Sequence, residues 1–315
     1  MQAVAVRTFR APAELMEVPS SPPGPGELLV RLEAAGVNPL DWKIVDGLYE
    51  GRRPHLFPIV LGVDGAGTVE ALGEGTRRFR VGDRIAGSFL HDPVGVGTYA
   101  QRTTVPETNA LAVVPPALPS TEAAALPTAG ITAVEVLELL SVPSGGTLLV
   151  VGASGGVGSI ATQLASRRGI RVVAAARPET EATVRALGAV EVLAPGDGLL
   201  PELKRRYPGG VDGLLDTGSD KPTFARLAPS VRRGGTALTT TFVADTSAAQ
   251  ADGIRRVNFN LQPRAETMAR LLAEYGSGDL RPPVSRVRPL AEGPQALIES
   301  RARRSVGKTV LSIPR

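Results

Sequence analysis

The clearest indication of the fold of this chain is the stretch Thr147-Leu-Leu-Val-Val-Gly-Ala-Ser-Gly-Gly-Val-Gly-Ser-Ile-Ala-Thr-Gln-Leu-Ala165. The apolar residues Leu148 to Val151 predict a strand, and the glycine-rich turn after them opens a segment with the apolar spacing of a helix. A strand, a glycine turn and a helix in this order begin a dinucleotide-binding unit, whose helix N-terminus binds a pyrophosphate through backbone N–H groups. The glycines are spaced Gly152-x-x-Gly155-x-x-Gly158, a variant of the usual G-x-G-x-x-G.

The same turn contains Gly152-Ala-Ser154-Gly-Gly156, which satisfies the G-x-S-x-G pattern of an α/β-hydrolase nucleophile. A hydrolase of that fold places its acid and then its histidine after the serine. Both histidines of this chain, His55 and His91, precede Ser154. We therefore interpret Ser154 as a small residue beside a phosphate.

Composition limits the class of protein. The 315 residues suggest two domains or one large one, and 43% hydrophobic residues suffice for a substantial core. No apolar run approaches the roughly 18 residues that span a bilayer, and the N-terminus lacks the features of a secretory signal, so we expect a cytoplasmic protein. With no cysteine, the chain cannot form disulfides, thiolate zinc sites or a cysteine nucleophile. A net charge of +4 and 4% aromatic residues argue against a specific nucleic-acid surface.

The pattern of expected secondary structure changes near Pro115-Pro-Ala-Leu-Pro119. Before it, short strands separated by Gly and Pro predict a β-rich, barrel-like domain. After it, strands and helices alternate, which predicts an α/β fold with a doubly wound parallel sheet. From Pro282 onward short strands return, with a helix over Pro294–Arg301.

The end of the second strand of the dinucleotide unit bears on the choice of cofactor. NAD-binding proteins usually carry an acidic residue there, about 20 residues after the glycines, to bind the ribose hydroxyls. This chain reads Ala175-Ala176-Arg177, with no acidic residue before Glu179. A small residue followed by arginine suits the 2′-phosphate of NADPH, because guanidinium binds phosphate bidentately. The alternative is that Arg177 only caps a surface loop.

Further motifs occur in order along almost the whole chain, and in combination they resemble the zinc-free quinone oxidoreductase branch (zeta-crystallin-like) of the medium-chain dehydrogenase/reductase superfamily. They are Ala34-Ala-Gly-Val-Asn38-Pro-Leu-Asp41-Trp-Lys, Gly62-Val-Asp64-Gly-Ala-Gly67, Arg80-Val-Gly82-Asp83, Gly97-Thr-Tyr99-Ala, Gly130-Ile-Thr132-Ala, Gly152–Gly158, Leu187-Gly-Ala189 and Gly307-Lys308-Thr-Val310.

The resemblance implies a GroES-like β-barrel catalytic domain built from both ends of the chain, residues 1–118 and 276–315. A Rossmann NADPH-binding domain, residues 119–275, would be inserted between them. It also implies a homodimer.

The zinc alcohol dehydrogenases of the same superfamily would carry Cys at the position of Asn38 and His-Glu at Val63-Asp64. They would also carry a four-cysteine lobe near residues 90–100, and this chain has none of these features. We therefore expect no metal site. Without a Lewis acid, alcohol oxidation is disfavoured, whereas reduction of an already electrophilic carbonyl or quinone stays feasible.

The resemblance and the predicted strand ends together suggest the cofactor residues. Asn38 and Thr132 would contact the nicotinamide ribose, and the glycine turn would line the pyrophosphate. The full expected set is Asn38, Thr132, Gly152, Ser154, Gly155, Gly156, Val157, Ala176, Arg177, Asp216, Thr217, Thr240, Arg303 and Lys308.

The expected catalytic residues are Tyr49 and Asn38. Tyr49 matches the position at which zinc-free enoyl reductases carry a tyrosine that acts on the substrate carbonyl. A phenol can hydrogen-bond a developing enolate oxygen or donate a proton to it, although Tyr49 could equally be a wall of the pocket. The expected substrate pocket comprises Trp42, Tyr49, His91 and Phe242. For Trp42 a place in the core, and for His91 a solvated loop, are the alternatives.

The sequence therefore predicts an NADPH-dependent, zinc-independent reductase that passes hydride to a small-molecule quinone or α,β-unsaturated carbonyl. Two alternatives stay open. One is a 2-enoyl-thioester or alkenal double-bond reductase. The other, of a different class, is an NADPH-binding sensor or RNA-associated protein with little turnover.

Overall fold

The structure, a computed structural model, describes the whole chain except residues 249–251, 303–305 and 315. The chain divides into two compact units. Unit 1 comprises Met1–Ile131 and Pro263–Arg315, and unit 2 comprises Thr132–Gln262.

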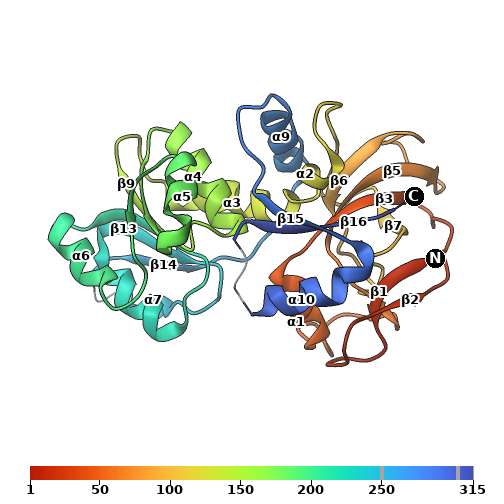
Figure 1. Cartoon of the computed structure of the whole chain (residues 1–315), viewed down its shortest axis with the longest axis horizontal. Coiled ribbons are helices and arrows are strands. Elements are labelled where there is room, and N and C mark those ends of the chain that lie inside the picture. The colour runs from red at the N-terminus through yellow and green to blue at the C-terminus, as the bar shows by residue number, and fades with distance from the viewer. Residues whose placement is uncertain (249–251, 303–305, 315) are drawn as a thin grey trace. The chain divides into compact units, whose positions relative to one another are not determined.

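Unit 2 is built on a six-stranded sheet in which every neighbouring pair is parallel, in the order β11-β10-β9-β12-β13-β14. Strands β9, β13 and β14 of this sheet are labelled in Figure 1. The strands are β9 (Thr147–Val151), β10 (Arg171–Ala175), β11 (Ala189–Leu193), β12 (Val211–Asp216), β13 (Val231–Thr239) and β14 (Arg255–Asn258). Successive strands run outward from β9 on one side and from β12 on the other. In an open α/β sheet, ligands bind at the carboxyl ends of the strands where the order reverses, here β9 and β12.

Helices connect these strands, as parallel pairing requires. Among the described residues they are α4 (Gly156–Arg167), α5 (Glu181–Ala186), α6 (Leu199–Arg206) and α7 (Lys221–Leu227), with single 3₁₀ turns at Pro178–Thr180, Ala228–Ser230 and Thr246–Ala248. A further helix, α3 (Pro127–Leu140), precedes β9. The apolar core on one side of the sheet includes Leu149, Leu214 and Phe224, all essentially inaccessible to solvent. This arrangement confirms the predicted Rossmann fold.

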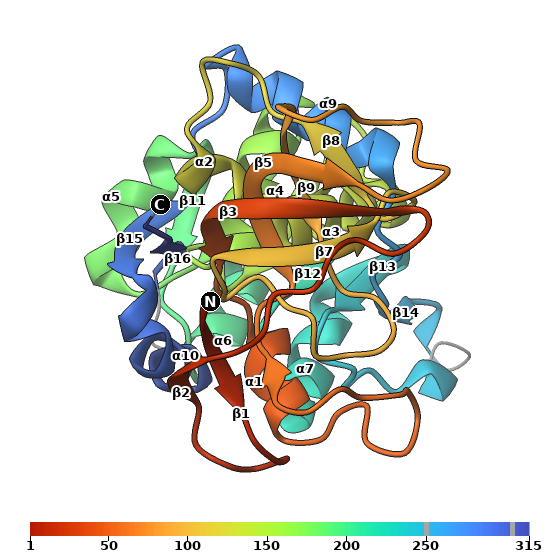
Figure 2. The same ribbon diagram turned by 90° about the vertical axis from the view of Figure 1, so that its right-hand side faces the viewer.

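Unit 1 contains two sheets. In the smaller, β1 (Gln2–Val6) lies between β2 (Glu14–Glu17) and β4 (Ile59–Val60). The larger runs in the order β15-β16-β3-β5-β6-β8, and β7 also pairs with β3. Its strands are β3 (Glu27–Gly36), β5 (Asp64–Leu72), β6 (Arg84–Ser88), β7 (Arg102–Pro106), β8 (Leu111–Val113), β15 (Val284–Pro289) and β16 (Lys308–Ser312). Figure 2 shows β3 between β5 and β7.

The two ends of the chain meet in the larger sheet. Strand β16, near the C-terminus, pairs antiparallel with β3, and Val310 lies opposite Gly36. Four helices belong to unit 1 alone, namely α1 (Pro39–Val45), α2 (Ser120–Ala123), α9 (Ala265–Gly276) and α10 (Gly293–Arg301). Unit 1 therefore contains strands from both ends of the chain.

The boundaries between the units differ from those expected at 118/119 and 275/276. They fall at Ile131/Thr132 and Gln262/Pro263. Helix α2 packs against β3 and β5, and α9 packs against β8. Tyr275 of α9 is buried, and a side chain at Gly276 would collide with Pro115. The segments that looked like the start and end of the Rossmann domain therefore belong to unit 1 by packing.

Among the described residues, every helix is too short or too polar to cross a lipid bilayer.

Candidate active site

The glycine turn after β9 has the geometry that the sequence predicts. Gly152 has a φ of +81°, a left-handed conformation that favours glycine. A Cβ at Gly152 would lie 2.3 Å from the Thr217 hydroxyl, and one at Gly158 would lie 2.2 Å from the carbonyl oxygen of Gly152. Glycine at these two positions lets α4 begin directly against the end of β9.

The N-terminus of α4 suits an anion. Its N-cap, Gly155, has an extended backbone and no side chain to accept from the first N–H groups of the helix. The first turn, which begins with Gly156 and Val157, contains no acidic residue. Because these N–H groups and the helix dipole favour a negative charge, this 12-residue helix fits the pyrophosphate of a dinucleotide. Ser154 lies partly buried in the same turn.

The end of β10 leaves an arginine accessible. The backbone N–H of Ala176 donates to Leu193 (3.1 Å), and the Ala176 side chain is buried. The side chain of Arg177 is 46% exposed, and its Nε lies 3.3 Å from Glu179 Oε1. An exposed pair of this kind contributes only about 0–1 kcal/mol, so the guanidinium can exchange Glu179 for a phosphate at little cost.

The carboxyl end of β12 is held by hydrogen bonds. Asp216 is fully buried. Its Oδ1 accepts from the backbone N–H of Ser219 (3.0 Å), and its Oδ2 accepts from the Thr239 hydroxyl (2.8 Å). The Thr217 hydroxyl donates to the Val151 carbonyl (2.9 Å), and the Thr240 N–H donates to the Asp216 carbonyl (3.0 Å). Asp216 was expected to contact the cofactor, and both of its carboxylate oxygens are already hydrogen-bonded to Ser219 and Thr239.

Two further expected residues lie elsewhere in unit 2. Thr132, in α3, is buried with 5% of its surface exposed. Phe242 is 58% exposed and has a φ of +62°, which is unusual for a bulky residue. Arg303, expected at the cofactor, lies outside the described residues.

In unit 1 the residues expected at the nicotinamide form a buried polar network. The ammonium of Lys308, on β16, donates to Asn38 Oδ1 (2.5 Å) and to the Val37 carbonyl (2.8 Å). Asn38 Nδ2 donates to Asp64 Oδ2 (2.9 Å) and, more weakly, to the Gly36 carbonyl (3.3 Å). The Asn38 amide therefore has a fixed orientation, with both its oxygen and its nitrogen already bonded within unit 1.

Two carboxylates complete the network. Asp64, on β5, also accepts from the hydroxyl (2.7 Å) and the backbone N–H (3.0 Å) of Thr128. Asp41, in α1, accepts at Oδ2 from the Asn38 N–H (2.7 Å) and from the Tyr99 hydroxyl (2.7 Å). Asp41, Asp64 and Tyr99 are all inaccessible to solvent.

Burial governs the ionisation of this network. It raises the pKa of Asp41 to about 7, against the opposing hydrogen bonds from Tyr99 and Asn38, and the charge of Asp64 adds to the rise. Burial also raises the pKa of Asp64, although Lys308 opposes it, and burial lowers the pKa of the Lys308 ammonium. One ammonium thus lies near two carboxyl groups whose pKa values are both raised, and the pKa of Asp41 reaches about 7.

Lys308, predicted as a cofactor residue, is hydrogen-bonded within unit 1, and its part in cofactor binding stays a prediction. Its side chain is 5% exposed, and its ammonium contacts Val37 and Asn38 rather than standing free for a phosphate. Asp41 was expected as a turn or cap residue, and its carboxylate does accept from the backbone N–H of Asn38 at the start of α1. The sequence analysis missed the parts played by Asp64, Tyr99 and Thr128. The available signals were a lysine that directly precedes the apolar end of the chain, in Lys308-Thr-Val-Leu, and an aspartate within Gly62-Val-Asp64-Gly-Ala, because buried charges need partners.

The expected substrate residues of unit 1 lie near its apolar core. Tyr49 and Trp42 are partly buried and pack against that core. The guanidinium carbon of Arg53 lies 5.0 Å from the Tyr49 ring centre, and that of Arg301 lies 5.5 Å from the Trp42 ring. Trp42 therefore covers the core, and its place in the substrate pocket stays a prediction.

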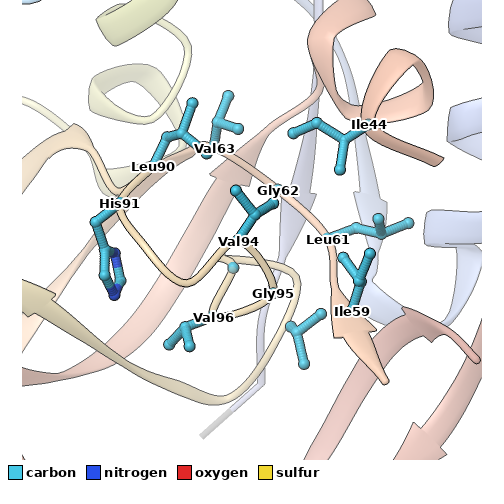
Figure 3. Close-up of a pocket in the computed structure, with 12 residues that line it drawn as sticks. Ile44, Ile59, Leu61, Gly62, Val63, Leu90, His91, Val94, Gly95 and Val96 are labelled. Atoms are coloured by element: carbon cyan, nitrogen blue, oxygen red, sulfur yellow. The ribbon is translucent and has the colours of Figure 1, made fainter. Parts of the chain in front are cut away.

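His91 borders a small apolar cavity beneath the loop that follows β6 (Figure 3). The cavity is about 10 Å³, room for roughly one water molecule, and His91 is the only polar side chain in its wall of twelve residues. The imidazole ring points away from the apolar side chains (Figure 3). His91 Nδ1 lies 2.8 Å from the Phe89 carbonyl oxygen, which can only accept, so Nδ1 carries the proton and Nε2 stays available.

Comparison with known proteins agrees with both units. Residues 24–116 match the alcohol dehydrogenase GroES-like domain, and residues 187–311 match the zinc-binding dehydrogenase family. The human synaptic vesicle membrane protein VAT-1 homologue is 31% identical over 95% of this chain and 82% of its own length. A chloroplast envelope quinone oxidoreductase homologue from Arabidopsis thaliana is 29% identical over 95% of this chain and 93% of its own.

This chain belongs to the quinone oxidoreductase branch of the medium-chain dehydrogenase/reductase superfamily. It is an oxidoreductase.

Solved structures of the superfamily share the fold over the full chain. The quinone oxidoreductase from Coxiella burnetii superposes with a TM-score of 0.90 at 25% identity, covering 100% of this chain and 99% of that one. A mycobacterial protein complexed with NADPH superposes with a TM-score of 0.87 at 29% identity, covering 99% and 100%. Among partial matches, a trans-enoyl reductase from Aspergillus japonicus is 37% identical over 53% of this chain and 51% of its own length.

The superfamily includes zinc-binding dehydrogenases, but the side chains that the structure describes do not form a zinc site. The chain has no cysteine. Within the part of the chain that the structure describes, no three histidine, aspartate or glutamate side chains converge as ligands. Around Asn38 and Asp64, the Asn38 amide donates to the Asp64 carboxylate, and the cationic Lys308 ammonium donates to the Asn38 amide oxygen. These side chains do not fit a zinc ion.

The raised pKa of Asp41 predicts a pH-dependent stability difference. The native state keeps a proton on Asp41 up to about pH 7, whereas the unfolded chain loses it near pH 4. The stabilisation from that proton is present below pH 4 and is lost as the pH rises to 7. Relative to wild type, Asp41→Asn should therefore gain free energy of unfolding from pH 4 to 7, by up to about 1.4 kcal/mol per pH unit. Urea unfolding at several pH values measures the difference.

Asp252→Asn is the matched control, because the hydrogen bond from Arg256 lowers the pKa of Asp252 to about 2. That substitution should alter the pH dependence only below about pH 4. A constant difference between Asp41→Asn and wild type across pH 4 to 7 would contradict the assignment.

Removing the buried ammonium of Lys308 should lower the free energy of unfolding, and the size of the loss should depend on the charge of Asp64. Lys308→Met leaves a buried carboxylate without its cation, so we expect a loss of about 3–5 kcal/mol in the free energy of unfolding. Lys308→Met combined with Asp64→Asn should lose less than the sum of the single changes, because no unpaired charge remains. Chemical unfolding of the four proteins measures the coupling, and strict additivity would show that the two charges do not interact.

Proposed function

We propose that this protein is an NADPH-dependent, zinc-independent reductase that transfers hydride to a quinone or to the β-carbon of an α,β-unsaturated carbonyl. The observation that carries the proposal is the bare N-terminus of α4 behind the Gly152 turn, at the strand ends where the sheet order reverses. Membership of the quinone oxidoreductase branch supports the acceptor. The homodimer and the location expected from the sequence stay predictions.

NADPH, when bound, supplies the hydride. The N–H groups at the start of α4 would bind its pyrophosphate, and the half-exposed guanidinium of Arg177 would bind its 2′-phosphate. The absence of an acidic residue at the end of β10 supports the phosphorylated cofactor over NADH, since a carboxylate there would repel the phosphate.

In unit 1, Tyr49 is proposed to act on the substrate carbonyl. Hydride arrival at the β-carbon leaves an electron pair on the carbonyl oxygen, and the phenol O–H can donate a hydrogen bond or a proton to it. Tautomerisation then places the proton on the α-carbon, giving the saturated ketone. Asn38, whose amide is fixed by Lys308 and Asp64, would present a rigid surface rather than a free donor.

The donor set supports zinc independence. A zinc site in this superfamily would need a thiolate, and the chain has none. A quinone or enone is already electrophilic, so positioning and removal of water can suffice without a Lewis acid.

Two competing functions deserve separate outcomes. The partial match to a trans-enoyl reductase favours a 2-enoyl-thioester or alkenal reductase as the alternative. An NADPH-binding protein with little turnover is the other. NADPH oxidation is followed at 340 nm with quinones, α,β-unsaturated ketones, alkenals and crotonyl thioesters. Turnover of quinones or of the ketones supports the proposal, turnover confined to alkenals or thioesters favours the first alternative, and tight binding without turnover favours the second.

Cofactor preference tests Arg177. Arg177→Gln removes a charged partner of the 2′-phosphate, so we expect the ratio of kcat/KM for NADPH to that for NADH to fall about 10- to 100-fold. Arg185→Gln, which breaks a similarly exposed pair with Glu181, is the control and should keep the ratio. An unchanged ratio in Arg177→Gln would mean that Arg177 only caps its loop.

The role of Tyr49 has its own test. Tyr49→Phe removes the donor to the carbonyl oxygen, and we expect kcat on enones to fall about 100-fold while the KM for NADPH stays the same. Tyr207→Phe, which removes a hydroxyl bonded to Glu191 in unit 2, is the control. Unaltered kcat in Tyr49→Phe would leave Tyr49 as a wall of the pocket.

A further inference from the structure

The turn that carries Tyr49 also brings an arginine over its ring. After α1, the chain passes through consecutive turns, and the Tyr49 carbonyl accepts from the backbone N–H groups of both Arg52 (2.9 Å) and Arg53 (3.1 Å). This tight turn folds the Arg53 side chain back, with its guanidinium carbon 5.0 Å from the Tyr49 ring centre. The two side chains therefore form one surface.

The guanidinium is held at one corner only. Arg53 Nε donates to Asp92 Oδ1 (2.6 Å), on the loop that also carries His91. No described residue accepts a hydrogen bond from either Nη atom of Arg53. A guanidinium carries five N–H donors, so Asp92 takes one and fixes the plane of the group while four remain available.

Partial burial strengthens the hydrogen bonds that the free N–H donors of Arg53 can form with an anion. The Arg53 side chain is 25% exposed, whereas that of Asp92 is 52% exposed. Asp92 is mostly solvated, so it neutralises the guanidinium only in part. The other acidic groups nearby have their own partners, since Glu50 pairs with Arg10 and Asp46 pairs with Arg301. A positive charge on a mostly buried group, with paired donors left over, suits a planar oxyanion that binds bidentately.

We propose that Arg53 is a specificity-determining residue that binds a carboxylate of the substrate, so that the preferred acceptors are α,β-unsaturated carbonyl compounds with an acid group close to the carbonyl. This inference rests on the proposed function, because it takes Tyr49 as the contact for the carbonyl oxygen. Since Arg53 lies over the ring of Tyr49, the carboxylate and the carbonyl must be only a few bonds apart. Neutral acceptors would bind without this contact.

The test compares trans-4-oxo-2-pentenoic acid with its methyl ester, using NADPH. The ester differs in intrinsic reactivity, so the informative quantity is the acid-to-ester ratio of kcat/KM in each variant relative to wild type. We expect Arg53→Gln to lower that ratio about 10- to 100-fold, the effect of one charge-assisted pair. Added salt should lower the wild-type ratio, because the guanidinium is partly exposed.

Two variants separate recognition from support of the turn. Asp92→Asn removes the ion pair and so weakens the same contact between the loops, but it leaves the guanidinium and an oxygen that can still accept from it, so the ratio should be kept or raised. Arg52→Gln removes a neighbouring exposed charge and should keep the ratio. If Arg53→Gln lowers kcat/KM equally for acid and ester, or if Asp92→Asn lowers the ratio as much as Arg53→Gln does, Arg53 is only a brace and the proposal is overturned.

Binding without turnover distinguishes this inference from the proposed function. The saturated products, 4-oxopentanoic acid and its methyl ester, are titrated into the protein with NADPH present, and Kd is measured by calorimetry. Tighter binding of the acid that Arg53→Gln abolishes supports the role of Arg53 even if no acceptor is reduced, in which case the proposed function alone fails. Turnover of quinones or enones with equal Kd values for acid and ester overturns the role of Arg53 and leaves the proposed function standing.

Discussion

The buried ammonium of Lys308 is the constraint on which unit 1 depends. It contacts Asn38 across 270 residues of sequence, and Asn38 in turn contacts Asp64. Charges without solvent are tolerated only when they are paired and hydrogen-bonded, so strand β16, the start of α1 and the start of β5 must meet at one point. The turn bearing Tyr49 and Arg53 follows α1 directly. The same network that joins the two ends of the chain therefore sets where the proposed substrate residues stand.

Unit 2 relies on close packing of backbone rather than on charge. At Gly152 and Gly158 a side chain would collide with Thr217 or with the turn itself. These glycines let α4 start at the end of β9, and its N–H groups are then free of side-chain caps. The two units thus differ in how they would bind ligands. Unit 2 offers backbone N–H groups that suit an anion, whereas unit 1 offers a rigid polar network beside apolar and aromatic residues. Hydride transfer between a cofactor and a carbonyl needs both, since the cofactor carries the reactive hydride and the protein supplies position.

The sequence predicted the parallel sheet and the glycine turn, because long periodic segments and glycine spacing are local signals. The joining of the chain ends is not a local signal, and it was expected only from the resemblance to a known family. It did not predict β2, β4 or β14, which are four residues or fewer. The unit boundaries also differ, because the packing of α9 on β8 is a long-range fact. Lys308 was predicted near the cofactor, yet its direction depends on Asn38, which no local pattern reveals. Likewise, the sequence did not point to Arg53, since its proposed role depends on its position over the Tyr49 ring and beside Asp92.

The central claim is that this protein moves hydride from NADPH to a conjugated carbonyl carbon. It is tested most directly by incubating the protein with an enone and NADPH deuterated at the transferable C4 position, and determining the mass and labelled position of the product. The account predicts a saturated ketone with deuterium at the β-carbon. An unlabelled product, or NADPH that binds tightly and is never oxidised by enones or quinones, would contradict it.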